Sequence, residues 1–387
     1  MGGYYMKQDV FGTKGDFITS PEISQMFGEL VGVWFVAQWK QMGSPSKFNI
    51  VELGPGRGTL MSDMLRTVTQ FNDFTRAINS VNMVEASPYL RGVQSKLLTG
   101  SDEDVASVAA SDAKTETVSE ENREGFQIHW HDALESIERG MWFECGVLVG
   151  FVDIMDVGLP ILLVAHEFFD AMPVYQFQMA SDGWREVMVD TDDSPSSPHN
   201  FRFILSPGAT KASVTLLQDE RYLRFKEGSR IEVSPDSYSY AHRIGQRIKE
   251  DGGFALIADY GKNLIMSDTM RVSCVIVYIL LLLFSEIMTQ GIQSHKFVSA
   301  LSKPGDSDLT ADVDFSFLTK AFTDAGVTST DIMSQGDYLR SMGIVQRLQV
   351  LMKIADAQKR KDLAQSYERL VGSSGVNGMG DIYKFMA

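Results

Sequence analysis

The chain has 387 residues, of which 44% are hydrophobic and 22% are charged. That balance excludes a disordered or fibrous protein, and the length allows one large or two ordinary domains. The formal net charge of −15 argues against a general nucleic-acid binder, because such a chain repels phosphate backbones. The acidity could attract a cationic substrate such as an arginine-rich segment, or it could serve solubility alone.

Cysteine and histidine usage gives no sign of a metal centre or of disulfides. Cys145 and Cys274 are the two cysteines; each lies among apolar residues, and they form no CxxC pair, so a reducing compartment is expected. His129 and His131 are spaced for one face of a strand, but no third ligand follows at a useful spacing. We therefore expect no bound metal.

The chain opens with a predicted loop over residues 1–20, in which Ser20 is a good helix N-cap and Pro21 a good first helical residue. A helix is predicted over residues 22–42. Strands and helices then alternate, in the order strand 48–53, helix 59–70, strand 81–85, helix 88–98, strand 126–130 and strand 161–165. This alternation predicts a parallel sheet, and the acidic residues 99–125 are predicted to be a surface loop.

The pattern changes after residue 173. Short alternating strands separated by turn residues fill residues 174–205, which predicts an antiparallel insertion. A helix follows to about residue 250, and residues 252–261 read as a further buried strand. Two apolar stretches, 141–160 and 272–284, contain acids and a proline or are too short for a comfortable bilayer span, so no membrane helix is expected.

These elements predict an α/β protein with a doubly wound, mostly parallel sheet and an antiparallel insertion. We expect residues 1–45 to form a loop and helix that cover the site. Residues 46–173 and 251–387 are expected to form the core, and residues 174–250 the insertion or substrate region.

The strongest local signal is the sequence ELGPGRGT at residues 52–59, in which a strand runs through glycines into a helix. Gly54, Gly56 and Gly58 let the backbone take positive φ and approach a ligand closely. The unpaired N–H groups of the helix face the same spot. A tight structural turn without a ligand is the alternative.

The spacing of the glycines favours S-adenosylmethionine over a dinucleotide. A dinucleotide fingerprint reads G-x-G-x-x-G, whereas here the third glycine comes one residue early. Glu52 precedes the glycines, and Glu85 ends the second strand, where its carboxylate suits the two ribose hydroxyls. We assign Glu52, the three glycines and Glu85 to cofactor binding, with an NAD-linked oxidoreductase as the alternative.

Polar residues also follow the third and fourth strands. We also assign Asp132 to cofactor binding, because it could accept a hydrogen bond from the adenine amino group, with Trp130 or Leu134 against the ring; the alternative is that it caps a helix. After the fourth strand, Glu167 and Asp170 could hold a guanidinium, with Phe168 against its face. We assign catalysis to Glu167 and Asp170; the alternative places the aromatic pair in the core and makes Asp170 a cap.

At this level of detail the chain resembles the MidA-like family of S-adenosylmethionine-dependent methyltransferases. Within that family it is most similar to the mitochondrial members, which are protein arginine methyltransferases that act as complex I assembly factors. The matching segments are residues 3–5, 15–28, 52–60, 85–94, 166–176, 183–186, 231–235, 259–261 and 303–315.

The resemblance implies symmetric dimethylation of an arginine in a complex I subunit, in the mitochondrial matrix, and a role in assembling that complex. A non-catalytic assembly chaperone with the same fold, or a methyltransferase for a small molecule, are the alternatives. Glu52, Glu85 and Glu167 are all present, which favours an enzyme.

The chain departs from the family pattern in two ways. Family members carry a transit peptide and a further helix before the Gly-Tyr-Tyr motif at residues 3–5, so we expect a truncated form. Residues 272–290 replace a short loop of the family, and residues 141–160 are a second unusual stretch. We hypothesise that residues 272–290 are a translated, retained intron, with residues 141–160 as a second candidate. A comparison of genomic and spliced sequences would test this.

Overall fold

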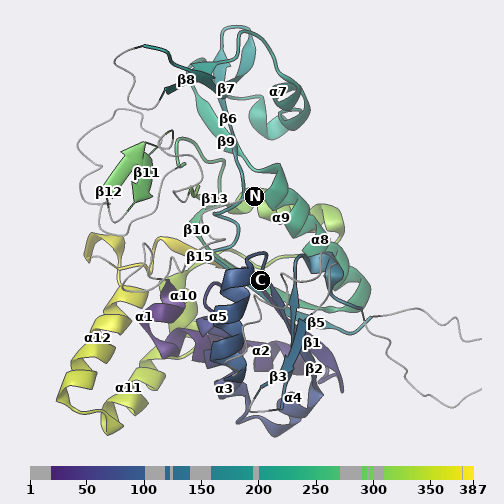
Figure 1. Cartoon of the computed structure of the whole chain (residues 1–387), viewed down its shortest axis with the longest axis vertical. Helices are drawn as coiled ribbons and strands as arrows, with labels where there is room; N and C mark the ends of the chain where they lie inside the picture. Colours follow the sequence, from purple (N-terminus) through teal and green to yellow (C-terminus); the bar gives the residue numbers. More distant parts are fainter. Residues whose placement is uncertain are drawn as a thin grey trace, which may run out of the picture.

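A large sheet with helices on both faces forms the lower part of the molecule, and a smaller antiparallel sheet rises above it (Figure 1). The computed structural model describes residues 19–100, 118–122, 125–139, 158–194, 200–270, 290–293, 296–299, 301, 309–376 and 378–387. The predictions for residues 1–18, for most of the acidic loop, and for the apolar stretches at 141–157 and 272–284 lie outside these ranges.

Nine strands make the large sheet, in the order β14-β15-β10-β5-β1-β2-β4-β3, with β13 also paired to β10. The strands are β1 (Phe48–Leu53), β2 (Ile78–Val84), β3 (Val118–Glu121), β4 (Gln127–His131), β5 (Ile161–His166), β10 (Gly253–Lys262), β13 (Val313–Asp314), β14 (Met333–Ser334) and β15 (Tyr383–Met386). The central five, β10, β5, β1, β2 and β4, are parallel. The predicted mostly parallel, doubly wound sheet is confirmed.

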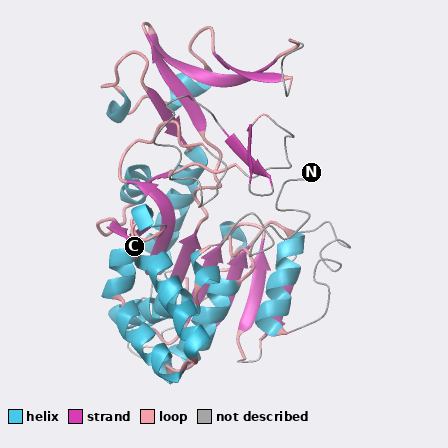
Figure 2. Ribbon diagram, turned by 90° about the vertical axis from the view of Figure 1, so that its left-hand side faces the viewer, coloured by secondary structure: helices cyan, strands magenta, loops and turns pink. Residues whose placement is uncertain are grey.

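Alternating side chains of the central strands enter two different cores. Ile50 and Leu256 pack on one face of the sheet, while Val51 and Ile257 pack on the other. Both β1 and β5 are buried along their whole length, because helices cover both faces (Figure 2). The continuous apolar sequence of these two strands therefore follows from burial on both sides.

One core includes side chains from α2 (Gln25–Gln41), α3 (Thr59–Val68), α4 (Asn72–Ala77), α5 (Pro88–Thr99), α10 (Gln335–Ser341), α11 (Ile344–Ile354) and α12 (Ala357–Val371). The other includes α8 (Pro235–Asp251) and α9 (Phe315–Ala325). Short 3-10 helices lie at Leu134–Ser136 and Ser374–Val376, and β11 (Gln290–Gln293) pairs only with β12 (Lys296–Ser299) among the described strands.

The antiparallel insertion is also present. Its sheet has the order β8-β7-β6-β9, formed by β6 (Tyr175–Ala180), β7 (Gly183–Thr191), β8 (Phe201–Leu205) and β9 (Arg230–Val233), with α7 (Lys211–Leu216) and a 3-10 helix at Glu220–Tyr222. Phe177 and Tyr222 are buried in a small core of its own. Arg221 ties the insertion to the main core, because its guanidinium pairs with Asp314 and lies 5.2 Å from the ring centroid of Phe317.

Two local predictions were wrong. The helix predicted over residues 22–42 is split into α1 (Ser20–Ile23) and α2, because Ser24 is extended and its hydroxyl caps α2 by accepting from the Met26 N–H at 3.3 Å. Thr19, not Ser20, is the N-cap of α1, since the Ser20 hydroxyl donates to Gln335 at 3.1 Å. The hydrogen bonds of these two serine side chains therefore differ from those that the local sequence predicts.

The acidic stretch predicted to be a loop contains strand β3, which pairs antiparallel with β4. The Glu120 carboxylate on this strand accepts hydrogen bonds from the hydroxyls of Ser95 and Thr99 on α5. A glutamate that was predicted to lie in a solvent-exposed loop therefore has hydrogen-bond partners on a neighbouring helix. Those partners are some 20 residues away in sequence, which explains why composition alone missed the strand.

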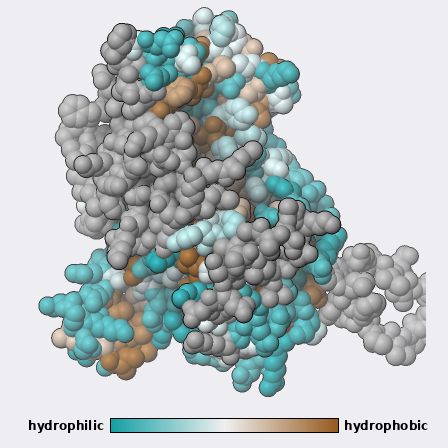
Figure 3. Space-filling view, in the orientation of Figure 1, coloured by the Kyte–Doolittle hydropathy of each residue, from teal (hydrophilic) through white to brown (hydrophobic). Residues whose placement is uncertain are grey.

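Apolar side chains are also exposed outside the two large cores. Val189 on β7 and Phe201, Phe203 and Leu205 on β8 share one side of the insertion sheet, and each is more than a third exposed. Brown patches in Figure 3 lie on the upper part of the molecule, where the insertion is, and over the lower helices. None of the described helices is long and apolar enough to cross a membrane.

Candidate active site

The turn after β1 has the predicted strand–glycine–helix arrangement. Gly54, Gly56 and Gly58 have φ values of +61°, +53° and +83°, all in the left-handed region that glycine tolerates best. Gly58 is the N-cap of α3, so the first N–H groups of that helix point toward the turn. The turn lies at the carboxyl end of β1, in the middle of the parallel strands, where open α/β sheets bind ligands.

Two of the three glycines are also required by packing. A Cβ atom on Gly54 would lie 3.0 Å from Cδ2 of Phe168, and one on Gly58 would lie 3.3 Å from Cγ of Gln94. The glycines alone would therefore also fit a purely structural turn. Evidence for a ligand has to come from the acids beside the turn.

Glu52 supplies such evidence. Its side chain is buried at the end of β1, and its Oε2 has no hydrogen-bond partner among the described residues. Burial, and secondarily the nearby Glu85 carboxylate, raise the pKa of Glu52 well above its ordinary value. A buried acceptor left without a donor is costly, so this position favours a ligand that brings a donor or a positive charge.

Glu85 follows β2, the strand next to β1. Its Oε1 accepts from the Ser87 N–H at 2.8 Å and its Oε2 from the Gln94 amide at 3.2 Å. Burial raises the pKa of Glu85, which the hydrogen bonds partly counter. A carboxylate has about four lone-pair sites, so both oxygens can still accept from the two hydroxyls of a ribose.

Asp132 lies after β4, with its side chain 54% exposed and paired with Arg91. Arg91 also donates to the Glu85 carbonyl at 2.7 Å, so it joins the ends of β2 and β4. The capping alternative for Asp132 was wrong, because the following 3-10 helix has Ala133 as its N-cap. Trp130, a suggested adenine contact, is fully buried, and the adenine role of Asp132 stays a prediction.

Glu167 occupies a strained backbone position directly after β5, with φ at +50°. Its N–H donates to the Ala258 carbonyl at 3.0 Å, and its Oε1 accepts from the Tyr383 hydroxyl at 2.9 Å. Burial first, and then the charge of Asp170, raise the pKa of Glu167 to about 8. A carboxyl group so placed becomes fully ionised at neutral pH only if a cation binds beside it.

Asp170 is buried three residues later and accepts from the Tyr260 hydroxyl at 2.7 Å. Asp259 holds this turn from β10: its Oδ2 accepts from the N–H groups of Phe169 at 3.0 Å and Asp170 at 3.2 Å. Burial, with the charges of Asp170 and Glu167, raises the pKa of Asp259. The structure thus brings three acids and two tyrosine hydroxyls together at one edge of the sheet.

Sequence reasoning missed Asp259 and Tyr383 as members of this cluster. Asp259 is part of the Asp-Tyr-Gly motif at residues 259–261, so its place after a strand was a usable signal. Tyr383 is on the antiparallel strand β15 near the end of the chain, and nothing in its local sequence indicates the site.

Phe168 packs beside the glycine turn, and its contact with a guanidinium stays a prediction. Its ring approaches Gly54 and packs edge-on against Phe169 at 5.3 Å and Tyr240 at 5.2 Å between centroids. It therefore lines the glycine turn, while the hydroxyls of Tyr260 and Tyr383 flank the acids.

His166, the last residue of β5, is buried beside the acids. Burial lowers its pKa to about 3, so its ring is neutral at physiological pH. Its Nε2 lies 3.7 Å from Oε1 of Glu167, and its ring stacks on Tyr383 at 6.3 Å between centroids. A neutral imidazole adds no positive charge that would satisfy Glu167.

The N-terminal part of the described chain also reaches the site. Glu22 on α1 lies 3.5 Å from the guanidinium of Arg57, which belongs to the glycine turn. The charge of Glu22 contributes to the raised pKa of Glu167. This helix therefore adjoins both the glycine turn and the acid cluster.

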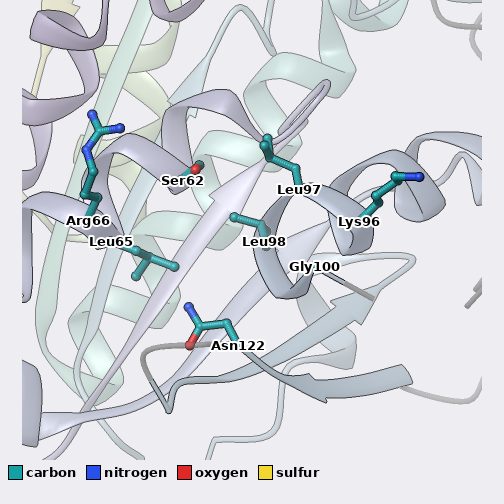
Figure 4. A pocket seen from close by; sticks show the side chains of 8 residues that line it. All are labelled: Ser62, Leu65, Arg66, Lys96, Leu97, Leu98, Gly100 and Asn122. Atoms are coloured by element: carbon teal, nitrogen blue, oxygen red, sulfur yellow. The ribbon is translucent and has the colours of Figure 1, made fainter. Parts of the chain in front are cut away.

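A separate pocket of about 230 Å³ lies between α3 and α5 and shares no residue with the predicted site (Figure 4). It is lined by Ser62, Leu65, Arg66, Lys96, Leu97, Leu98, Gly100 and Asn122. Within the described parts of the chain, no group of three or more side chains is arranged to hold a metal ion.

Comparison with known proteins shows the family to which the chain belongs. The family described as "Putative S-adenosyl-L-methionine-dependent methyltransferase" matches residues 30–333. The chain belongs to this methyltransferase family. S-Adenosylmethionine is therefore its methyl donor, and the NAD-linked alternative is wrong.

Full-length relatives of this methyltransferase are known from animals. The mitochondrial "Protein arginine methyltransferase NDUFAF7" of zebrafish is 37% identical over 386 residues, which cover 100% of this chain and 79% of the relative. The human protein of the same name is 37% identical over 387 residues, covering 100% of this chain and 76% of the relative.

A solved structure shares the fold of this methyltransferase. A protein from Burkholderia thailandensis, crystallised with S-adenosyl-homocysteine bound, superposes with a TM-score of 0.67 at 21% identity, over 98% of this chain and 81% of that chain. The residues at the carboxyl edge fit such a ligand, because Glu52 has an unsatisfied buried oxygen and Glu85 can still accept hydrogen bonds.

Proposed function

We propose that the chain is a protein arginine methyltransferase that modifies an arginine of a respiratory complex I subunit in the mitochondrial matrix. Symmetric dimethylarginine is the expected product, and assembly of complex I is the expected role. The relatives named as mitochondrial protein arginine methyltransferases support the substrate class and the location. The observation that carries the proposal is the Glu167 carboxyl group, which is partly buried among other acids and has no lysine or arginine paired with it among the described residues.

The cofactor is proposed to lie over the glycine turn. Glu52 would hold the cationic amino end, Glu85 the ribose hydroxyls and Asp132 the adenine amino group, with Gly54, Gly56 and Gly58 leaving room for its approach. When bound there, S-adenosylmethionine supplies an electrophilic methyl group on its sulfonium sulfur.

Glu167 and Asp170 are proposed to bind the guanidinium of the substrate arginine. Arginine remains protonated at working pH, so its charge has to be drawn away from the nitrogen that attacks. The Tyr383 hydroxyl holds Oε1 of Glu167, which orients Oε2 for an N–H donor of the guanidinium. Asp170 is fixed in the same way by Tyr260, and Asp259 holds the turn between them.

The proton balance also favours Glu167. The attacking nitrogen gains a methyl group and loses one proton, so the product stays a monocation. A carboxylate whose pKa has been raised to about 8 is a suitable acceptor for that proton at Oε2. The reacting atoms must be held about 3–3.5 Å apart with water excluded, and burial of the acid cluster favours both conditions.

Within residues 174–250, the antiparallel insertion from β6 to β9 is proposed to contact the protein substrate. It leaves the core at β6, five residues after Asp170, and rises above the carboxyl edge of the sheet (Figure 1). The exposed apolar side of β7 and β8 suits a protein surface better than a small molecule. This favours a protein substrate over a small one.

Mass spectrometry tests the proposal. The purified chain, incubated with S-adenosylmethionine and dissociated complex I subunits, should introduce dimethylarginine into one subunit. Methylation of a metabolite with no protein product would support the small-molecule alternative. Binding of S-adenosylmethionine without any turnover would support the assembly chaperone.

A pH profile tests the role of Glu167. Because kcat/KM reports the free enzyme, it should rise about tenfold per pH unit below pH 8 and level off above it, as Glu167 loses its proton and can bind the guanidinium. Glu22, Asp170, Asp259, His166 and Tyr383 surround this group. Initial rates with an arginine peptide from pH 6 to 9 measure this rising limb of the pH profile.

The Tyr383→Phe variant is the control for that assignment. The Tyr383 hydroxyl stabilises the carboxylate and so lowers the pKa of Glu167. Removing it should therefore move the limb to higher pH. A limb that stays in place in this variant, or a flat profile in the original chain, would contradict the assignment.

A further inference from the structure

Gln94 on α5 is a buried side chain that joins three parts of the cofactor site. Its Nε2 donates to the Gly56 carbonyl at 2.7 Å and to Oε2 of Glu85 at 3.2 Å. Its Oε1 accepts from the indole N–H of Trp130 at 2.9 Å. The side chain is fully buried, and its Cγ packs against Gly58.

The orientation of the Gln94 amide is determined by its partners. An indole N–H can only donate, so the amide oxygen must face Trp130. The NH₂ group is then left for two acceptors, the Gly56 carbonyl and the Glu85 carboxylate. Every hydrogen bond of this amide is thus directional, and reversing the amide would break all three.

We propose that Gln94 is a positioning residue for S-adenosylmethionine: its amide locks the glycine turn to the ribose-binding carboxylate of Glu85. The inference rests on the proposed seat of the cofactor. The turn after β1 and the acid after β2 lie on different strands, so their spacing would otherwise depend on backbone alone. A single amide donating to both holds them at the separation that the ligand needs before it arrives, which lowers the cost of binding.

The Gln94→Glu variant separates positioning from mere packing, because it keeps the shape of the side chain. An ionised glutamate cannot donate to Gly56 or to Glu85, and it places a second charge beside Glu85. When protonated, it regains one O–H donor. Glu52, Glu85, Arg91 and Asp132 are the charged groups around this position.

The cofactor affinity of Gln94→Glu is therefore expected to fall at least tenfold at pH 8.5 and to recover partly at pH 6. The original chain should show no such recovery, because glutamine has no ionisable group at position 94. Calorimetric titration with S-adenosylmethionine at several pH values measures the ratio of the two dissociation constants. The KM for the cofactor should rise, while kcat at saturation stays within about twofold.

Three further variants make the test decisive. Gln94→Leu, which removes the donors without adding charge, should bind weakly at every pH. Gln349→Glu, the same substitution at an exposed position of α11, should bind like the original chain. Glu85→Ala tests the seat itself: normal affinity there would overturn the proposed cofactor site. Weak binding by Glu85→Ala together with normal, pH-independent binding by Gln94→Glu and Gln94→Leu would overturn the role of Gln94 alone.

Discussion

The Glu167→Gln variant should lose about a thousandfold in kcat/KM for an arginine peptide while binding S-adenosylmethionine as tightly as the original chain. Glutamine has nearly the same shape, and it can still accept from the Tyr383 hydroxyl. It brings no negative charge, so a buried guanidinium would have lost one partner of its ion pair. Such a loss costs about 3–5 kcal/mol, and each 1.4 kcal/mol is about tenfold.

Steady-state kinetics and calorimetry together check this result. Glu368→Gln is the matched control, because the same change at an exposed residue of α12, outside both the acid cluster and the insertion, should alter neither measurement. The pH limb below 8 should also disappear from the residual activity of Glu167→Gln. A variant that retained more than a tenth of its activity would show that Glu167 does not hold the substrate's charge.

The parts of the fold that depend on local patterning were predicted from the sequence. Strand β1 has the predicted bounds, because an apolar run this short, between a turn and a glycine cluster, favours a buried strand over a helix. The antiparallel insertion and a helix ending near residue 250 were also predicted, and the structure shows that Ser234 caps this helix, α8, by accepting from the Ser237 N–H. In each case the determining interactions lie within a few residues.

The parts that depend on distant pairing could not be predicted. Tyr383 contacts Glu167 across 216 residues, and it does so because β15 enters the sheet antiparallel beside β10. The ring of Phe168 fills the space that a side chain at position 54 would need, and no local pattern indicates this contact between two different strand ends. The neighbouring strands determine the direction in which a side chain points at the end of a strand. A local sequence pattern contains no information on which strands are neighbours.

The acid cluster shows both what could be predicted from the sequence and what could not. Glu167 and Asp170 stand three residues apart, so their proximity could be inferred from the sequence. Their protonation could not, because it depends on how deeply the turn is buried and on Asp259, which arrives from β10. The order of the strands therefore determines the protonation of these acids, because it brings Asp259 beside them. The identity of two of the acids can be inferred from one short segment of sequence.

The Gly56→Val variant should abolish measurable binding of S-adenosylmethionine. Gly56 has a φ of +53°, a conformation that a β-branched residue avoids at a cost of about 1–3 kcal/mol. The branched side chain would also occupy the space through which the cofactor is proposed to approach the turn. Because the Gly56 carbonyl accepts from Gln94, any shift that relieves the strain would also disturb Glu85.

Calorimetry with S-adenosylmethionine measures the effect, and thermal unfolding shows whether the fold survives. Gly228→Val provides the matched control: Gly228 has a φ of +86°, nothing lies within 4 Å of an added Cβ atom, and the residue lies in the insertion before β9. The same backbone strain there should lower stability by a similar amount and leave cofactor affinity unchanged. Near-normal affinity in Gly56→Val would mean that the cofactor does not pass over this turn. Equal losses of affinity in both variants would mean that strain, and not the lost space, explains the effect.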